Sequence, residues 1–426
     1  MEPVIEQVHK MNLFKSLVLY LRLWFHLTHQ TSRRLDIMDI LFVCIACSWL
    51  FLLLFMVGEI SLSQKEAWNF FFNEDPFFTA FRAIFHALAF LRLGGDYTLK
   101  IPLLFLNICN LFLLYGICRH TLRHKCDSLI AILICITLPA VNFSALLLVE
   151  SGWVLFLSLL ICYFLTRYKQ VPLFLLFFLA LLSSGVLILS LGIALFMLKT
   201  KHYKTAIFCL ACAILNYCLY DFGIDGIPRG YFLDTLGQLA LLYSPLLFVY
   251  YVYSIYWGIV HKQSLLAYIA GTSLVFCILL SLRQNIDFYT LAPQSLVGIP
   301  VMVQCFLNDL RTHLPQFRTK HYIISSILLF ALFLQTAMIF GNKITYFFSD
   351  KPNFAANYYF SKEIARALKD YGITAIKAPK SLTLPLQFYG IQKGGDFILE
   401  PTKSKKADIQ IRYNHTAIVR FNLEKK

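Results

Sequence analysis

The chain has 426 residues and a formal net charge of +15; 58% of it is hydrophobic, 16% aromatic and only 14% charged. Soluble domains usually carry about 25% charged residues, so this composition excludes a water-soluble enzyme, a disordered chain and a disulfide-rich secreted module, and predicts a polytopic α-helical membrane protein. The basic residues lie in gaps between apolar runs and in the C-terminal tail, without an Arg-rich helix, which favours membrane lipids with anionic headgroups as partners and argues against nucleic acid.

The chain begins with a basic segment, residues 1–36, which predicts a cytoplasmic amphipathic helix on the membrane surface. Apolar runs follow it, and we predict about 11 transmembrane helices from them. These spans are expected at about 37–57, 101–118, 127–146, 151–166, 171–183, 185–198, 205–220, 237–258, 264–281, 289–307 and 322–342. The stretch 171–198 is either one long helix or a tight helical hairpin, and the break at Ser183, Ser184 and Gly185 favours the hairpin.

The distribution of basic residues gives this topology a direction. With the N-terminus inside, seventeen basic residues fall in inner segments and six in outer loops. The positive-inside rule therefore predicts a transmembrane domain over 37–342, whose first outer loop is 58–100, in an inner (cytoplasmic) membrane with the N-terminus cytoplasmic.

The tail, residues 343–426, predicts a small extracytoplasmic α/β domain. Ser361 can cap a helix that runs through Leu368, and Gly372 suits its C-terminal end. Short β-type runs follow at 373–376, 397–399, 409–412 and 417–421.

The first outer loop holds the candidate catalytic acids. Glu59 stands at the membrane edge, where a carboxylate can act as general base on an acceptor hydroxyl; the alternative is an acid that only marks where the helix leaves the membrane. Glu74 or Asp75 is expected to be a second acid, which positions the acceptor or a cation. The sequence predicts no particular cofactor and leaves a divalent cation open. Cys118, His120, His124 and Cys126 have only one pair at zinc spacing, and we favour an ordinary basic inner loop there.

The run DPFFTAFRAIFHALAFLRLGGDYTLKIPLLFLNICNLFLLY resembles a stretch in the GT-C superfamily of membrane glycosyltransferases, in the branch of the protein mannosyltransferases and aminoarabinose transferases. The positions that carry the resemblance are Glu59, Pro76, Gly95, Lys100 and Pro102. Weaker matches follow at Leu138-Pro139, Leu148-Val149-Glu150, Leu182–Gly185, Phe288-Tyr289 and Pro293. The sequence departs from the family where Asp75 and Ser184 stand in place of lysines.

The resemblance implies an enzyme that transfers a sugar from a polyprenyl-phosphate-linked donor to an envelope acceptor, which is lipid A, lipopolysaccharide, another glycan or a protein. Glu59 would act as base, with Glu74 or Asp75 beside it. Candidate substrate-binding residues are Lys65, Arg82, His86, Lys100, Glu150, Arg229, Arg283 and Tyr289. For the basic ones, the alternative is that their charges reach lipid headgroups. Glu150 either orients an acceptor or ends a span.

The sequence also bears on two other classes of function. The missing lysines suggest a non-catalytic GT-C-like membrane partner of another lipopolysaccharide-modifying enzyme, such as a trimming glycosidase. A transporter or flippase predicts charges inside the spans and related halves, and the sequence shows neither.

Overall fold

The computed structural model describes residues 36–425 except 92–93, 221–229, 313, 342, 344–345, 347–357, 403, 405–406 and 414–415. The chain forms two compact units, 1–44 and 45–426. Of the first unit only 36–44 are described, so the amphipathic helix predicted within 1–36 lies outside the described residues.

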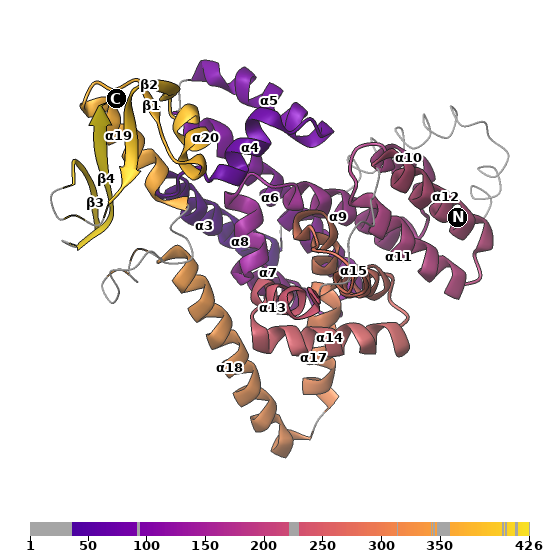
Figure 1. Ribbon diagram of the computed structural model, residues 1–426. Coiled ribbons are helices and arrows are strands. Elements are labelled where there is room, and N and C mark those ends of the chain that lie inside the picture. The colour runs from indigo at the N-terminus through magenta and orange to yellow at the C-terminus, as the bar shows by residue number, and fades with distance from the viewer. Residues whose placement is uncertain are drawn as a thin grey trace. The chain divides into compact units, whose positions relative to one another are not determined.

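Helices make up most of the described chain (Figure 1). They are α3 (Ile37–Glu59), α4 (Gln64–Phe72), α5 (Pro76–Leu88), η1 (Ala89–Leu91), α6 (Gly95–Thr121), α7 (Lys125–Thr137), α8 (Pro139–Leu146), α9 (Ser151–Tyr168), α10 (Leu173–Ala180), α11 (Val186–Lys199), α12 (Tyr203–Leu219), α13 (Phe232–Tyr243), α14 (Pro245–Val260), α15 (Leu265–Ser281), α16 (Phe288–Leu291), η2 (Pro293–Gly298), α17 (Ile299–Thr312), α18 (Pro315–Phe340), α19 (Phe360–Asp370) and α20 (Lys380–Phe388).

The helices make the chain a multi-pass helical membrane protein. Among the described residues, five helices are long and apolar enough to cross a membrane, or up to seven if each bent pair is one span. The bent pairs are α7 with α8, at 62°, and α13 with α14, at 96°. Every predicted apolar run coincides with a helix or a bent pair, but several helices are short, so the count of about eleven spans is not confirmed.

Proline explains the two bends. Pro139 and Pro245 are the first residues of α8 and α14. A proline disfavours helical backbone in the residue before it, and both preceding residues are non-helical: Leu138 is extended (ψ 131°), whereas Ser244 has a positive φ of 73°. The break predicted after α10 is also present, because residues 181–185 separate α10 from α11.

Buried amides join the helices to one another. Asn107 in α6 donates to the carbonyl oxygen of Ser144, and Asn110 donates to that of Gly152. Asn216 in α12 donates to the carbonyl oxygens of Ala180 and Ser183. Such bonds are typical between helices in a membrane, where close packing and polar side chains hold neighbouring helices together.

The C-terminal residues form a four-stranded sheet in the order β1-β2-β4-β3. The strands are β1 (Ala375–Lys377), β2 (Gln392–Pro401), β3 (Ile409–Tyr413) and β4 (Thr416–Lys425). β1 is parallel to β2 with Ala375 opposite Gln392, and β4 pairs antiparallel with both β2 and β3. Gly395 (φ 91°) allows the close approach of β1, because a Cβ there would lie 2.6 Å from the carbonyl oxygen of Ala375.

The predicted helix of this segment is α19, which begins one residue before Ser361. Its N-cap residue is Tyr359, and Ser361 is buried inside the first turn rather than capping it. Gly372 has φ 73° and donates its N–H to the carbonyl oxygen of Lys369, as expected at a helix C-terminus. The sheet belongs to the same compact unit as the helices, so a separate C-terminal domain stays a prediction.

Candidate functional site

Glu59, the first predicted catalytic acid, is the last residue of α3 and is paired. Its Oε2 atom accepts a hydrogen bond and ion pair from Nζ of Lys343, and the two side chains are 41% and 34% exposed. The same ammonium group lies 5.6 Å from the centre of the Tyr359 ring. One oxygen of Glu59 is therefore already bound to a cation rather than open to an acceptor hydroxyl.

The segment between α3 and α6, residues 60–94, contains an acid that the sequence analysis does not predict as a site residue. Glu66 in α4 is only 2% exposed, and its Oε2 atom accepts from the N–H and the hydroxyl of Ser63 at 3.0 and 2.8 Å. This pair forms a capping box, in which a serine and a glutamate three residues later satisfy the free N–H groups of a helix start. The spacing Ser63-x-x-Glu66 is the signal that predicts this role from sequence.

α4 also holds the second loop, residues 147–150. The N–H of Leu148 donates to Oε1 of Glu66 at 2.9 Å, and the carbonyl oxygen of Leu148 accepts from Nδ2 of Asn69 at 3.2 Å. Both peptide groups of Leu148 are therefore bound by side chains of one helix. Glu150 follows two residues later and is the N-cap residue of α9.

The charges of two acids, Asp75 and Asp287, act on Glu150, and we call Asp75, Glu150 and Asp287 the carboxyl cluster. Asp75 and Asp287 are the exposed N-cap residues of α5 and α16, whereas Glu150 is only 7% exposed. Burial, together with the charges of Asp75 and Asp287, raises the pKa of Glu150 to about 7. A carboxyl group with such a pKa both takes up and releases a proton near neutral pH, which suits general acid–base chemistry.

Two predicted substrate-binding residues meet beside this cluster. Nζ of Lys65, in α4, lies 4.3 Å from the centre of the Tyr289 ring, in α16. Asp287 accepts a hydrogen bond from the N–H of Tyr289 at 3.2 Å, which fixes the start of α16. Tyr220, the residue after α12, donates its hydroxyl to the carbonyl oxygen of Leu181 at 2.9 Å, and burial, together with the charges of Glu150 and Asp75, raises its pKa.

Lys100 lies in a different group of charges, which we call the junction cluster: Glu66, Asp96, Lys100, Lys362 and Tyr389. Oδ2 of Asp96 accepts from Lys362 at 2.7 Å, and Oδ1 accepts from the hydroxyl of Tyr389, also at 2.7 Å. Lys100 is 0% exposed, and the carboxylates of Glu66 and Asp96 act on its charge. Its Nζ atom has no hydrogen-bond partner among the described residues, and its complete burial separates it from a substrate in solution.

The other predicted site residues are dispersed. Arg82 donates to the carbonyl oxygens of Phe71 and Asn73 at 3.1 and 2.9 Å, which satisfies the C-terminal end of α4. Glu74, His86 and Arg283 are exposed, and Arg229 lies outside the described residues. In the part of the chain that the structure describes, no group of three or more His, Cys, Asp or Glu could hold a metal ion.

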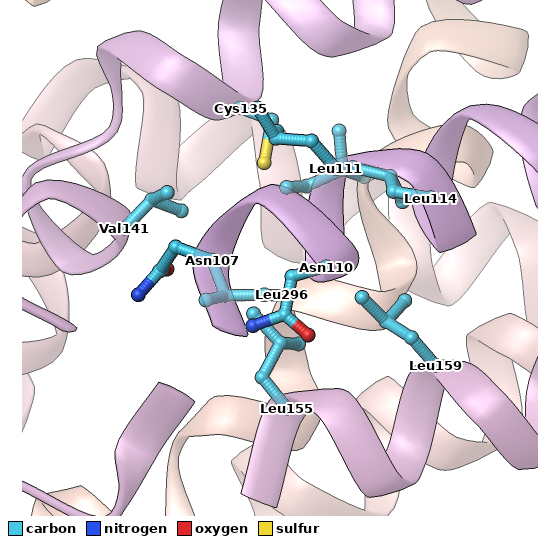
Figure 2. Close-up of a pocket in the computed structure, with 10 residues that line it drawn as sticks. Asn107, Asn110, Leu111, Leu114, Cys135, Val141, Leu155, Leu159 and Leu296 are labelled. Atoms are coloured by element: carbon cyan, nitrogen blue, oxygen red, sulfur yellow. The ribbon is translucent and has the colours of Figure 1, made fainter. Parts of the chain in front are cut away.

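A small cavity lies within the helices and, among the described residues, has no charged residue in its lining (Figure 2). Its lining includes the amides of Asn107 and Asn110 and the apolar side chains of Leu155 and Leu296, and it has room for about one water. Oδ1 of Asn110 has no hydrogen-bond partner among the described residues. The cavity therefore fits a single buried water rather than a sugar.

No protein-family model matches this sequence, and no curated protein matches it either. The resemblance to the GT-C superfamily therefore stays a prediction.

Proposed function

We propose that this chain is a GT-C-type glycosyltransferase that transfers a sugar from a polyprenyl-phosphate-linked donor to an envelope acceptor at the outer face of the inner membrane. The observation that carries the proposal is the carboxyl cluster, in which Glu150 is buried at the start of α9 and is acted on by the charges of the exposed acids Asp75 and Asp287. The proposal includes the finer topology, with about eleven crossings, a cytoplasmic N-terminus and a small extracytoplasmic C-terminal domain. The distribution of basic residues supports that orientation.

We assign the role of general base to Glu150 in preference to Glu59. The carboxylate of Glu150 takes the proton of the acceptor hydroxyl while that oxygen attacks the anomeric carbon of the donor. The bond from the anomeric carbon to the phosphate oxygen breaks, its electron pair goes to that oxygen, and polyprenyl phosphate leaves. Burial of Glu150 and the neighbouring charges make it a stronger base than an ordinary carboxylate, whereas Glu59 already binds Lys343.

Positive charge is required where the phosphate leaves, because an anion near hydrocarbon is costly unless it is paired. Lys65 suits this role, since it is exposed and stands over Tyr289 beside the carboxyl cluster. Asp75 and Asp287 contribute negative charge, which stabilises a positively charged sugar in the transition state.

The test is a comparison of envelope glycolipids and glycoproteins by mass spectrometry in cells that lack the gene and in cells complemented with variants. We expect a mass difference of one sugar in the deletion, restored by the wild type and by Asp370→Asn, an exposed acid at the end of α19. Glu150→Gln should not restore it. An unchanged glycan profile in the deletion would refute the transferase function.

A second function is favoured by two contacts. Glu59 is paired with Lys343 and Lys100 is buried against acids, so two positions that resemble the family's site are occupied by internal partners. The alternative is a non-catalytic membrane partner of another lipopolysaccharide-modifying enzyme. It predicts that the deletion alters the glycan whereas Glu150→Gln and Glu59→Gln both restore it.

A further inference from the structure

We propose that Glu66 and Asn69 are positioning residues that hold Glu150 in the carboxyl cluster by binding both peptide groups of Leu148. The inference rests on the proposed function, because it explains how the proposed base is kept in place. It adds two residues of α4 that contact neither the acid nor a substrate.

The two side chains are suited to this task by their place on α4. They are three residues apart, so they lie on the same face of the helix. Glu66 is 2% and Asn69 5% exposed. One supplies an acceptor for the N–H of Leu148 at 2.9 Å and the other a donor for its carbonyl oxygen at 3.2 Å. Because Leu148 is itself fully buried, its peptide groups need partners from the protein.

The segment from Leu148 to Glu150 is short and is fixed at both ends. α4 holds Leu148, and the carbonyl oxygen of Glu150 accepts from the N–H groups of Trp153 and Val154, near the start of α9. The intervening Val149 is 3% exposed. Glu150 therefore has little freedom to turn toward water while both ends are held.

Release of Leu148 would change the surroundings of Glu150 in a definite direction. As the N-cap residue of α9, Glu150 makes no side-chain hydrogen bond to the helix. A freed carboxylate would reach water and the N–H groups at the start of α9, and both favour its ionised form. The charged and titratable groups that face it are Asp75, Asp287 and Tyr220 from α5, α16 and the end of α12, and substitution at Asn69 alters none of them.

The structure also explains how α4 can exert this hold. The carboxylate of Glu66 accepts a hydrogen bond from the hydroxyl of Ser63 at 2.8 Å. Just before α4, Leu62 donates its N–H to the hydroxyl of Tyr389, in the C-terminal segment, at 3.0 Å. Phe70 packs against Phe388 of α20 with ring centres 5.5 Å apart. α4 is therefore fixed by the C-terminal segment on one side and holds the second loop on the other.

The experiment is an infrared pH titration of the full-length protein in lipid nanodiscs, without substrate. The carboxyl band of Glu150 is identified by its loss in Glu150→Gln. We expect a midpoint near the wild-type pKa of about 7. Asn69→Ala, which keeps every charge, should lower this midpoint by about one unit or more toward the ordinary value for Glu. Trp68→Ala, at a 49% exposed position on the same helix, should leave it unchanged.

The second variant is Glu66→Gln. Its amide oxygen can still accept the hydrogen bond from the N–H of Leu148, but the negative charge beside Lys100 is lost. We therefore expect a smaller decrease of the midpoint than in Asn69→Ala. An unchanged midpoint in folded Asn69→Ala and Glu66→Gln protein would overturn the proposal, as would an equal decrease in Trp68→Ala. The titration needs no turnover, so its result is independent of whether Glu150→Gln restores the glycan. Failure of the proposed function and failure of the positioning role are therefore separate outcomes.

Discussion

Replacement of Lys362 by methionine should weaken the attachment of the C-terminal segment to the start of α6. The ammonium group of Lys362 lies 2.7 Å from Oδ2 of Asp96 and also donates to the carbonyl oxygen of Gly58 at 3.1 Å. Asp96 is only 6% exposed, so the substitution removes a cation from a buried carboxylate. Methionine keeps the length and apolar character of the side chain, which restricts the change largely to the charge.

The magnitude follows from the partners that remain. Loss of a hydrogen bond to a charged group costs about 1.5–3 kcal/mol, and removal of one partner of a buried ion pair costs about 3–5 kcal/mol. Lys362 is 29% exposed, and Asp96 keeps its hydrogen bond from the hydroxyl of Tyr389. We therefore expect a decrease of about 2–3 kcal/mol in the free energy of unfolding, in the lower part of that range.

The assay is equilibrium unfolding of the purified full-length protein in detergent, arranged as a double-mutant cycle with Asp96→Asn. Lys369→Met is the matched control, because Lys369 is an exposed lysine of the same helix, α19; it should change stability by less than about 0.5 kcal/mol. A coupling energy between positions 96 and 362 below about 0.5 kcal/mol would refute the reasoning, since that value is typical of an exposed ion pair.

Two further predictions concern the helices and the carboxyl cluster. Gly192→Ala should destabilise the protein by about 1–3 kcal/mol, because its Cβ would lie 2.8 Å from Cα of Ile269 and force α11 away from α15. Gly237→Ala, where no atom lies within 4 Å of the new Cβ, should be neutral or slightly stabilising in the same unfolding assay; equal effects at the two positions would contradict the packing of α11 on α15. Glu150→Gln should raise the free energy of unfolding above about pH 7, because the folded wild type then holds a buried, ionised carboxylate whose pKa is raised from 4.5 to about 7, whereas glutamine carries no charge. The contribution of the protonated acid is full below pH 4.5 and lost as the pH rises to about 7, so the difference between variant and wild type should grow to about 3 kcal/mol over this window. An unfolding series from pH 4 to pH 8 in which the difference stays constant would show that Glu150 is not buried.

Part of the candidate site could be predicted from the sequence. The sequence predicts the site residues Asp75, Glu150, Lys65 and Tyr289. The structure places the ammonium group of Lys65 over the Tyr289 ring and Asp75 near Glu150. Asp287 was not selected, although it directly precedes the Phe288-Tyr289 pair. Chemical type and a place at the end of an apolar run are local properties, which explains why they identified residues but not their partners.

The sequence by itself determined the helices. Apolar runs of sufficient length predict membrane helices, because transfer into lipid depends on nearby residues. The runs 127–146 and 237–258 predict single spans, whereas the structure bends each of them, at Pro139 and Pro245. Only the tertiary structure decided which charges meet. Glu59 pairs with Lys343 across 284 residues, and Tyr389 bonds Asp96 across 293, whereas Glu66 and Asn69 hold Leu148 across 82 and 79. Contacts at such separations depend on how the helices pack, and that packing left Glu150 buried and Glu59 paired with Lys343.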